Sequence, residues 1–125
     1  MDEERSFVAM SASTKIEKLY EQMNQSRLMS FDKDSRRILN AVLKVTGHPQ
    51  SEIFSNRREA NVVLARHIAM YLTVELTGKS YPVVGKMYLR DYSSVFNACK
   101  KIRNRGRGRK PMNTILNAVL EELTA

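Results

Sequence analysis

The chain of 125 residues contains one cysteine, Cys99, three prolines and no tryptophan. A single cysteine excludes an internal disulfide and a zinc site made of cysteines. No apolar run approaches the roughly 20 residues needed to cross a bilayer. The chain starts MDEERSF, which is acidic rather than basic and then apolar, so no signal peptide is visible. These absences favour a protein of the reducing cytoplasm with no membrane partner.

Acidic residues are scarce beyond residue 34. Residues 35–125 hold 16 Lys or Arg and six Asp or Glu, whereas residues 1–34 hold five and seven. Residues 90–110 alone carry eight basic side chains and one acid, Asp91. Such clustering is the electrostatic footprint of a nucleic-acid binder, although a well-solvated basic surface would give the same count.

The scarcity of acids also argues against an enzyme. No two acids beyond residue 34 have the spacing of a metal pair or an acid–base couple. His48 and His67 lack a third ligand at metal spacing, so surface or capping roles are expected for both. The chain contains no G-x-x-x-x-G-K-[ST] phosphate loop. We therefore expect no catalysis, no metal, no cofactor and no small-molecule substrate.

Apolar residues recur at helical spacing throughout, which predicts an all-α fold. The expected helices cover residues 15–27, Asp34 to Gly47, 51–54 and 59–76, with a closing helix over 112–123. Thr14 and Glu17 have capping-box spacing, and Asp34 is a good N-cap. Gly47 ends the second helix and Gly78 the longest one.

Three apolar faces are expected to form the core. They hold Ile38, Leu39, Val42 and Val45 on the second helix, Val62, Ala65, Ile68, Ala69, Leu72 and Leu76 on the longest, and Met112, Ile115, Leu116, Val119, Leu120 and Leu123 on the last. A further stripe of Ile16, Leu19, Tyr20 and Met23 lies near the N-terminus. It either packs on its own domain or, through residues 14–28, pairs with a protein partner or a second copy.

The stretch from Gly78 to Arg103 predicts two short helices joined by a tight turn. Pro82 suits the first turn of one helix, which runs to about residue 88, and Asp91 suits the N-cap of the next. On the second helix the inward positions are Val95, Ala98, Cys99 and Ile102, with Cys99 a buried apolar residue rather than a reactive one. The outward positions are Ser93, Ser94, Asn97, Lys100 and Lys101. This is the layout of a DNA-reading helix-turn-helix.

Four runs of residues carry a resemblance to a known family. Residues 90–95 read Arg-Asp-Tyr-Ser-Ser-Val and residues 97–102 read Asn-Ala-Cys-Lys-Lys-Ile. Residues 55–58 read Ser-Asn-Arg-Arg, and residues 70–77 read Met-Tyr-Leu-Thr-Val-Glu-Leu-Thr. Together they resemble the C-terminal DNA-binding domain of the bacterial replication initiator DnaA, whose signature is Arg-Asp-His-Thr-Thr-Val and then His-Ala-Cys-Arg-Lys-Ile. The resemblance covers about residues 36–123 and implies a Trp-repressor-like helical bundle with a helix-turn-helix in its C-terminal half.

The resemblance also implies roles for single residues. In the family the arginine that matches Arg58 enters the minor groove, and the proline that matches Pro82 lies against the DNA. The major-groove contacts match Asp91, Tyr92, Ser93 and Ser94, although Tyr92 could equally pack on the turn. The full predicted DNA-binding set is Arg57, Arg58, Pro82, Arg90, Asp91, Tyr92, Ser93, Ser94, Asn97, Lys100, Lys101, Arg105 and Arg107. The last two belong to a Gly-Arg run that either clamps the DNA backbone or is a basic linker.

Departures from the family pattern predict that the preferred DNA sequence differs from the family's box. The family's histidine is Tyr92 and its two threonines are Ser93 and Ser94, which lack the methyl group that touches thymine. The turn is one residue shorter, with Tyr88-Leu89 in place of Gly-Gly. Nothing resembles the family's ATPase domain, so ATP-driven origin melting is not expected. The family's targets are asymmetric nine-base boxes bound by single domains.

We therefore expect an N-terminal extension over residues 1–33 and a DnaA-like helix-turn-helix domain over 34–125. The expected function is sequence-specific binding of double-stranded DNA at the bacterial nucleoid, to regulate transcription or replication initiation through DnaA-box-like sites. One alternative is a protein-interaction adaptor that is tethered to DNA. Another is a sequence-blind nucleic-acid-coating protein driven by counterion release.

Overall fold

The computed structural model describes residues 11–12, 14–16, 18–19, 31–105 and 110–125. The chain divides into two units, Met1–Ser30 and Phe31–Ala125. In the first unit the described residues from 14 to 19 are helical, and the Thr14 amide donates to Ser11 Oγ at 3.3 Å. The hydroxyl that caps this turn thus belongs to Ser11, and the prediction that Thr14 starts the helix is wrong. Glu17, Tyr20 and Met23 lie outside the described residues.

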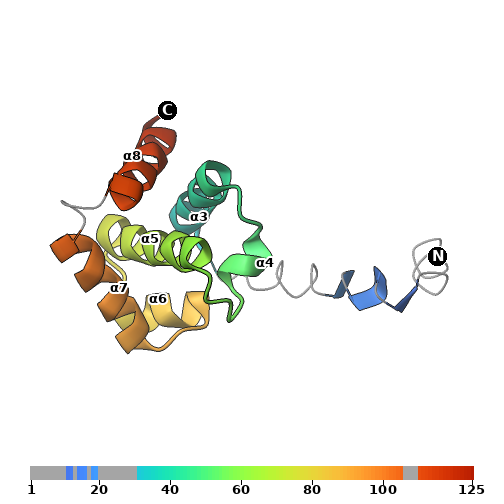
Figure 1. The fold of residues 1–125 in the computed structure, drawn as a ribbon. Coiled ribbons are helices and arrows are strands. Elements are labelled where there is room, and N and C mark those ends of the chain that lie inside the picture. The colour runs from blue at the N-terminus through green and yellow to red at the C-terminus, as the bar shows by residue number, and fades with distance from the viewer. Residues whose placement is uncertain (1–10, 13, 17, 20–30, 106–109) are drawn as a thin grey trace. The chain divides into compact units, whose positions relative to one another are not determined.

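The second unit is built entirely from helices (Figure 1). They are α3 (Lys33–Thr46), α4 (Gln50–Ile53), α5 (Ala60–Thr77), α6 (Tyr81–Tyr88), α7 (Tyr92–Arg105) and α8 (Lys110–Thr124). No strand occurs in the described ranges, and none of their helices is long and apolar enough to cross a membrane. The all-α prediction and the helix-turn-helix of α6 and α7 are confirmed.

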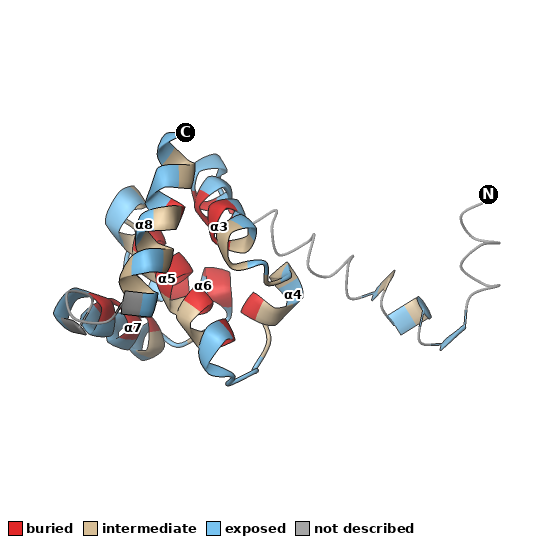
Figure 2. Cartoon of the chain, turned by 45° about the horizontal axis from the view of Figure 1, so that its top comes forward, coloured by how far each residue is buried: buried red, intermediate tan, exposed pale blue. Residues whose placement is uncertain are grey.

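Helix α5 lies at the centre of this unit. It contacts α3, α4, α6 and α7, and α8 packs on α3. Figure 1 shows α5 between the α3–α8 pair and the α6–α7 pair. Figure 2 shows the buried residues on the sides of these helices that face one another. The helix-turn-helix is therefore supported from behind by the longest helix of the fold.

The helix ends follow from local chemistry. The Asp32 carboxylate accepts the Ser35 amide at 3.3 Å, so the N-cap of α3 is Asp32. The predicted cap Asp34 is wrong because that residue already lies in the first helical turn. Gly47 and Gly78 end α3 and α5 at φ 73° and 72°, a left-handed conformation that glycine adopts without strain.

The predicted core is confirmed on α5 except at its last turn. Val62, Ala65, Ile68, Ala69 and Leu72 are at most 3% exposed. Leu76 was expected among them but is 57% exposed, and Glu75 beside it is exposed as well.

Helix α8 is covered less than its apolar face predicts. Only Val119 is fully buried, and Leu120 is 36% exposed. Its main packing partner is α3, where Lys44 Nζ lies 2.7 Å from Glu122 Oε1 and Arg37 donates to the Leu123 carbonyl at 3.1 Å. One neighbouring helix covers only part of a broad apolar face.

An aromatic cluster joins α4 to the end of α6. The ring of Tyr88 lies 5.3 Å from that of Phe31 and 5.7 Å from that of Phe54. Tyr88 is fully buried, which raises the pKa of its hydroxyl, and Thr73 Oγ1 lies 3.5 Å from that oxygen. Tyr88 therefore anchors the turn that follows α6.

Candidate nucleic-acid interface

The turn between α6 and α7 is tight and includes a left-handed residue other than glycine. Leu89 has φ 57° and ψ 44°, a conformation that costs a side chain with a Cβ roughly 1–2 kcal/mol. Its amide approaches the Lys86 carbonyl at 3.4 Å, and the Arg90 amide donates to the Gly85 carbonyl at 2.8 Å. The chain thus turns directly from α6 into α7, and this turn sets the angle between the two helices.

Gly85 makes this close approach possible. A Cβ on Gly85 would lie 2.5 Å from the Arg90 carbonyl oxygen, which is shorter than any real contact of that kind. Gly85 was not among the residues predicted from the sequence to matter for the site. A glycine inside a short helix is the signal that could have found it, since glycine in a helix interior is unfavourable without a packing reason.

The inner face of α7 is buried as predicted. Val95, Ala98 and Cys99 are fully buried and Ile102 is 3% exposed. Burial raises the pKa of the Cys99 thiol, which fits an apolar packing role. The Asp91 carbonyl accepts the Ser94 amide at 3.0 Å, so α7 begins at the predicted place.

The outer face of α7 carries most of the predicted contact residues. The exposed ones are Asp91, Tyr92, Ser93, Asn97, Lys100 and Lys101, and Ser94 is half-buried. Tyr92 is 64% exposed and does not pack into the turn. One surface of a single helix therefore presents a carboxylate, hydroxyls, an amide and two ammonium groups.

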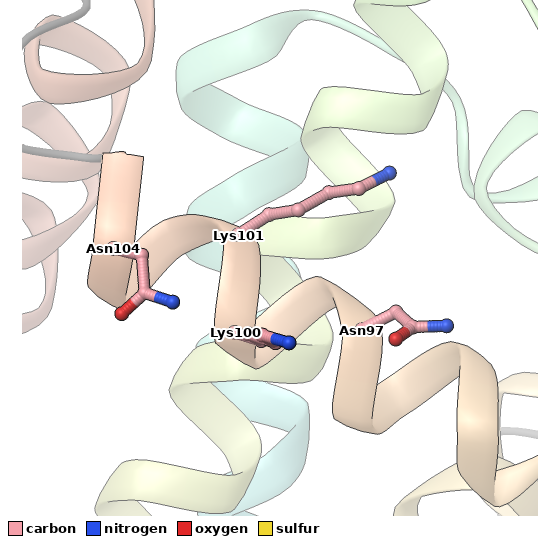
Figure 3. Close-up of a pocket in the computed structure, with 4 residues that line it drawn as sticks. All are labelled: Asn97, Lys100, Lys101 and Asn104. Carbon is pink, nitrogen blue, oxygen red and sulfur yellow. The ribbon is translucent and has the colours of Figure 1, made fainter.

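The basic half of this surface is shown in Figure 3. Asn97, Lys100, Lys101 and Asn104 line a shallow hollow along α7. Asn104 was not predicted, although it lies four residues after Lys100 and seven after Asn97 and so shares their face. Amide and ammonium groups in this arrangement match phosphate oxygens and base edges.

The start of α6 lies beside α7. The ring of Tyr81 meets that of Phe96 edge-on at 5.7 Å, and Phe96 is still 45% exposed. Pro82, next to Tyr81, is exposed. Apolar surface thus borders the polar face of α7 on the side of Pro82. The family resemblance predicts that this proline lies against DNA.

Arg57 and Arg58 lie in the loop between α4 and α5 and are exposed. Arg57 Nη1 lies 3.4 Å from Glu52 Oε1 and 4.0 Å from Glu59 Oε1. No hydrogen bond or ion pair joins the Arg58 side chain to another residue in the described ranges. Of the two arginines, Arg58 is the one whose charge is not shared with a carboxylate.

Two further arginines bind backbone carbonyls next to this loop. Arg90 donates to the carbonyls of Ser55 and, at 3.1 Å, Leu89, and burial lowers the pKa of its guanidinium. Arg66, on α5, is 5% exposed and donates to Ile53 at 2.7 Å and to Ser55 at 2.9 Å. Arg90 was predicted from the sequence as a DNA contact, and Arg66 was not predicted. The place of Arg66, four residues after Val62 on the apolar face, was the available signal.

Arg103 holds the other end of α7. Its guanidinium pairs with the Glu75 carboxylate and donates to the Tyr81 hydroxyl at 3.3 Å, and the carboxylate raises the pKa of Arg103. Arg90 and Arg103 therefore fasten α7 near both ends. Arg105 is the last residue of α7, and its side chain is not described. Arg107 lies outside the described residues.

His67 is half-buried behind the basic face. Burial, and then the charges of Lys101, Arg66 and Arg90, lower the pKa of His67 to about 4. The imidazole is therefore neutral near pH 7. His48 Nδ1 lies 2.8 Å from Glu52 Oε2, and the described residues contain no group of three side chains able to hold a metal ion.

Comparisons with known proteins point to one family. The profile of a family described as "Bacterial dnaA protein helix-turn-helix" matches residues 35–102. The chain is 40% identical over 73 residues to the chromosomal replication initiator protein DnaA of Bordetella pertussis, and 44% identical over 68 residues to that of Streptococcus mutans. These matches cover 58% and 54% of the chain and 15% of each relative. The DnaA of Onion yellows phytoplasma is 28% identical over 104 residues, which are 82% of the chain and 20% of that protein.

Proposed function

Because this chain belongs to the family of the bacterial DnaA helix-turn-helix, we propose that it binds double-stranded DNA in a sequence-specific manner and regulates transcription or replication initiation. The observation that carries the proposal is the two-sided character of α7. Its apolar side is fully buried, whereas its other side exposes Asp91, Tyr92 and Ser93 at the start and Lys100 and Lys101 further along. A helix of this kind is suited to the major groove.

The residues divide into two proposed roles. Asp91, Tyr92, Ser93 and Ser94 contact base edges, because short polar side chains at the start of a recognition helix reach the bases. The phosphate and sugar contacts come from Asn97, Lys100, Lys101, Arg105 and Arg107, with Pro82 against the backbone and Arg57 beside it. Arg58 enters the adjacent minor groove. Phosphate contacts set position and affinity, and base contacts set specificity.

We propose that the target is related to the DnaA box and differs from it. Serine at positions 93 and 94 keeps the hydroxyl of the family's threonine and lacks its methyl group, which weakens contact with the C5-methyl of thymine. Tyr92, 64% exposed, presents a phenol ring where the family has the imidazole of histidine. Three altered side chains at the start of α7 are enough to move the preference at neighbouring bases.

Occupation of such sites is the proposed means of regulation. The matched segments span 15–20% of the length of the DnaA relatives, and the helix-turn-helix profile matches residues 35–102 of this chain. A protein that binds box-like sites through this domain competes with an initiator at an origin or with RNA polymerase at a promoter. Either effect requires only DNA binding.

In-vitro selection from a randomised duplex pool at physiological salt tests the proposal. Enrichment of an asymmetric motif of about nine base pairs is the expected result, and its similarity to the DnaA box separates a replication competitor from a promoter regulator. Binding without enrichment would instead identify a sequence-blind coating protein. A partner captured only when residues 1–30 are present, with no enriched motif, would favour the adaptor.

A further inference from the structure

The loop that carries Arg58 is held by one buried side chain. Arg66 Nε donates to the Ile53 carbonyl at 2.7 Å, and Nη2 donates to the Ser55 carbonyl at 2.9 Å. Nη2 also approaches the carbonyls of Glu52 and Arg57 at 3.3 Å each. A single guanidinium thus contacts the backbone of the whole stretch from the end of α4 to the residue before Arg58.

The charge of Arg66 is compensated by peptide dipoles. No carboxylate pairs with it among the residues the structure describes. The last carbonyls of a helix have no partner inside that helix and carry its negative partial charge, and those of α4 point at this guanidinium. Burial lowers the pKa of Arg66 to about 10, so it remains charged near neutral pH. Lysine cannot reproduce this arrangement, because an ammonium group is a point charge without the planar fork.

Arg90 approaches the same loop from the turn of the helix-turn-helix. Its guanidinium donates to the Ser55 carbonyl, which also accepts Arg66. The carbonyl oxygen of Ser55 therefore joins three parts of the fold, namely α5, the loop of residues 54–59 (the arginine loop) and the start of α7. The two positively charged guanidinium groups meet at this carbonyl, and the charge of Arg90 further lowers the pKa of Arg66.

We propose that Arg66 is a positioning residue for DNA binding. By holding the carbonyls of Ser55 and Arg57, it sets the place of Arg58 relative to α7, so that the minor-groove arginine and the major-groove helix engage one duplex together. This inference rests on the proposed function. It assigns to Arg66 an effect on binding that passes through Arg58 and requires no contact between Arg66 and DNA.

A double-mutant cycle tests this link. The probe is the duplex enriched by the selection described above, and affinities are measured at a temperature where every variant is folded. Arg58→Ala is expected to weaken binding about 30-fold, as for loss of a base contact. Arg66→Lys is expected to weaken it about tenfold in the wild-type background and less than twofold in the Arg58→Ala background. A tenfold loss in both backgrounds would mean that Arg66 acts on binding independently of Arg58 and would overturn the proposal.

Arg103→Lys is the matched control. Arg103 also fastens part of the interface, through Glu75 and Tyr81, but it does not touch the arginine loop. Its effect on affinity is expected to be the same with and without Arg58. If Arg66→Lys does not fold, Arg90→Lys is used instead, because it removes a contact to Ser55 and leaves all four contacts of Arg66. Additivity of Arg90→Lys with Arg58→Ala would then count against the proposal.

Hydrogen exchange of the free protein gives a readout that does not depend on DNA. The Ser55 amide lies 3.2 Å from the Glu52 carbonyl, and the Arg57 amide lies 3.2 Å from Ser55 Oγ. Arg66→Lys is expected to speed exchange at both amides about tenfold and to leave residues 95–102 of α7 unchanged. Unchanged exchange in the loop would overturn the positioning role. If the wild-type protein bound no duplex, the proposed function would fail, and this measurement would still decide whether Arg66 holds the loop.

Discussion

The two pairs of helices on either side of α5 follow different rules. The α3–α8 pair keeps ordinary local preferences in three features, which are a glycine C-cap, a buried Val119 and an exposed ion pair between Lys44 and Glu122. The α6–α7 pair breaks several local preferences, with a left-handed Leu89 and a glycine inside a helix. Proteins keep such exceptions where the surrounding structure requires them, commonly at functional sites. The comparison indicates that the α6–α7 side was shaped by a requirement beyond stability.

The largest expected effect is on the turn itself. Gly85→Ala places a Cβ 2.5 Å from the Arg90 carbonyl, a backbone atom that cannot move without displacing α7. We expect the free energy of unfolding to fall by about 3 kcal/mol, at the upper end for overpacking. Gly47→Ala, on the α3–α8 side, has open space around the new methyl group and only a left-handed φ, so a loss of about 1 kcal/mol is expected. Urea denaturation measures both, and equal losses would remove the distinction between the two pairs.

A second expected effect concerns His67, which lies behind the α6–α7 side, and the pH dependence of the free energy of unfolding. The pKa of His67 is about 4 in the folded protein and 6.5 in an unfolded chain, so between these values the unfolded state binds the extra proton. Stability is therefore complete above pH 6.5 and falls as the pH drops toward 4, by about 1 kcal/mol per pH unit. His67→Gln removes this contribution. Denaturant titrations at pH 7 and pH 5 on both proteins isolate it, and an identical pH dependence would show that His67 is not buried against the basic cluster of Lys101, Arg66 and Arg90.

Loss of a base contact should weaken binding to the selected duplex and leave binding to random DNA nearly unchanged. Ser94→Ala is expected to weaken binding to the selected duplex by about 2 kcal/mol and to leave binding to random DNA nearly unchanged. Thr114→Ala removes an exposed hydroxyl from α8 and should affect neither. Competition binding with the two duplexes measures this. Equal losses on both would remove Ser94 from the residues that read bases.

The smallest effect is expected from a single phosphate contact. Lys100→Ala should weaken binding to every sequence by a similar factor and reduce the magnitude of the salt slope by about 1. Lys44→Ala removes a lysine from the α3–α8 side and should leave the slope unchanged. Titrations at several salt concentrations measure both slopes. Equal slopes for Lys100→Ala and the wild-type protein would show that the basic face of α7 does not meet the DNA backbone at this point.

Most helices and the buried face of α7 were predictable because their signals are local. Glycine after an apolar stripe ends α3 and α5, and the i, i+3, i+4, i+7 spacing of Val95, Ala98, Cys99 and Ile102 was sufficient to orient α7. The predictions that were wrong concern the ends of helices and the margin of the core. Asp34 was preferred to Asp32 as a cap although both have the same side chain, and Leu76 was placed in the core although it is 57% exposed.

The sequence by itself determined the helical fold, the helix-turn-helix and the polar outer face of α7, because each depends on residues within a few turns of one another. Only the tertiary structure decided what the arginines do. The Arg66–Ser55, Arg103–Glu75 and Arg90–Ser55 contacts join residues that are 11, 28 and 35 positions apart. Arginine has the same five donors in a surface patch and in a buried cradle of carbonyls, and only the approach of distant backbone shows which one it occupies.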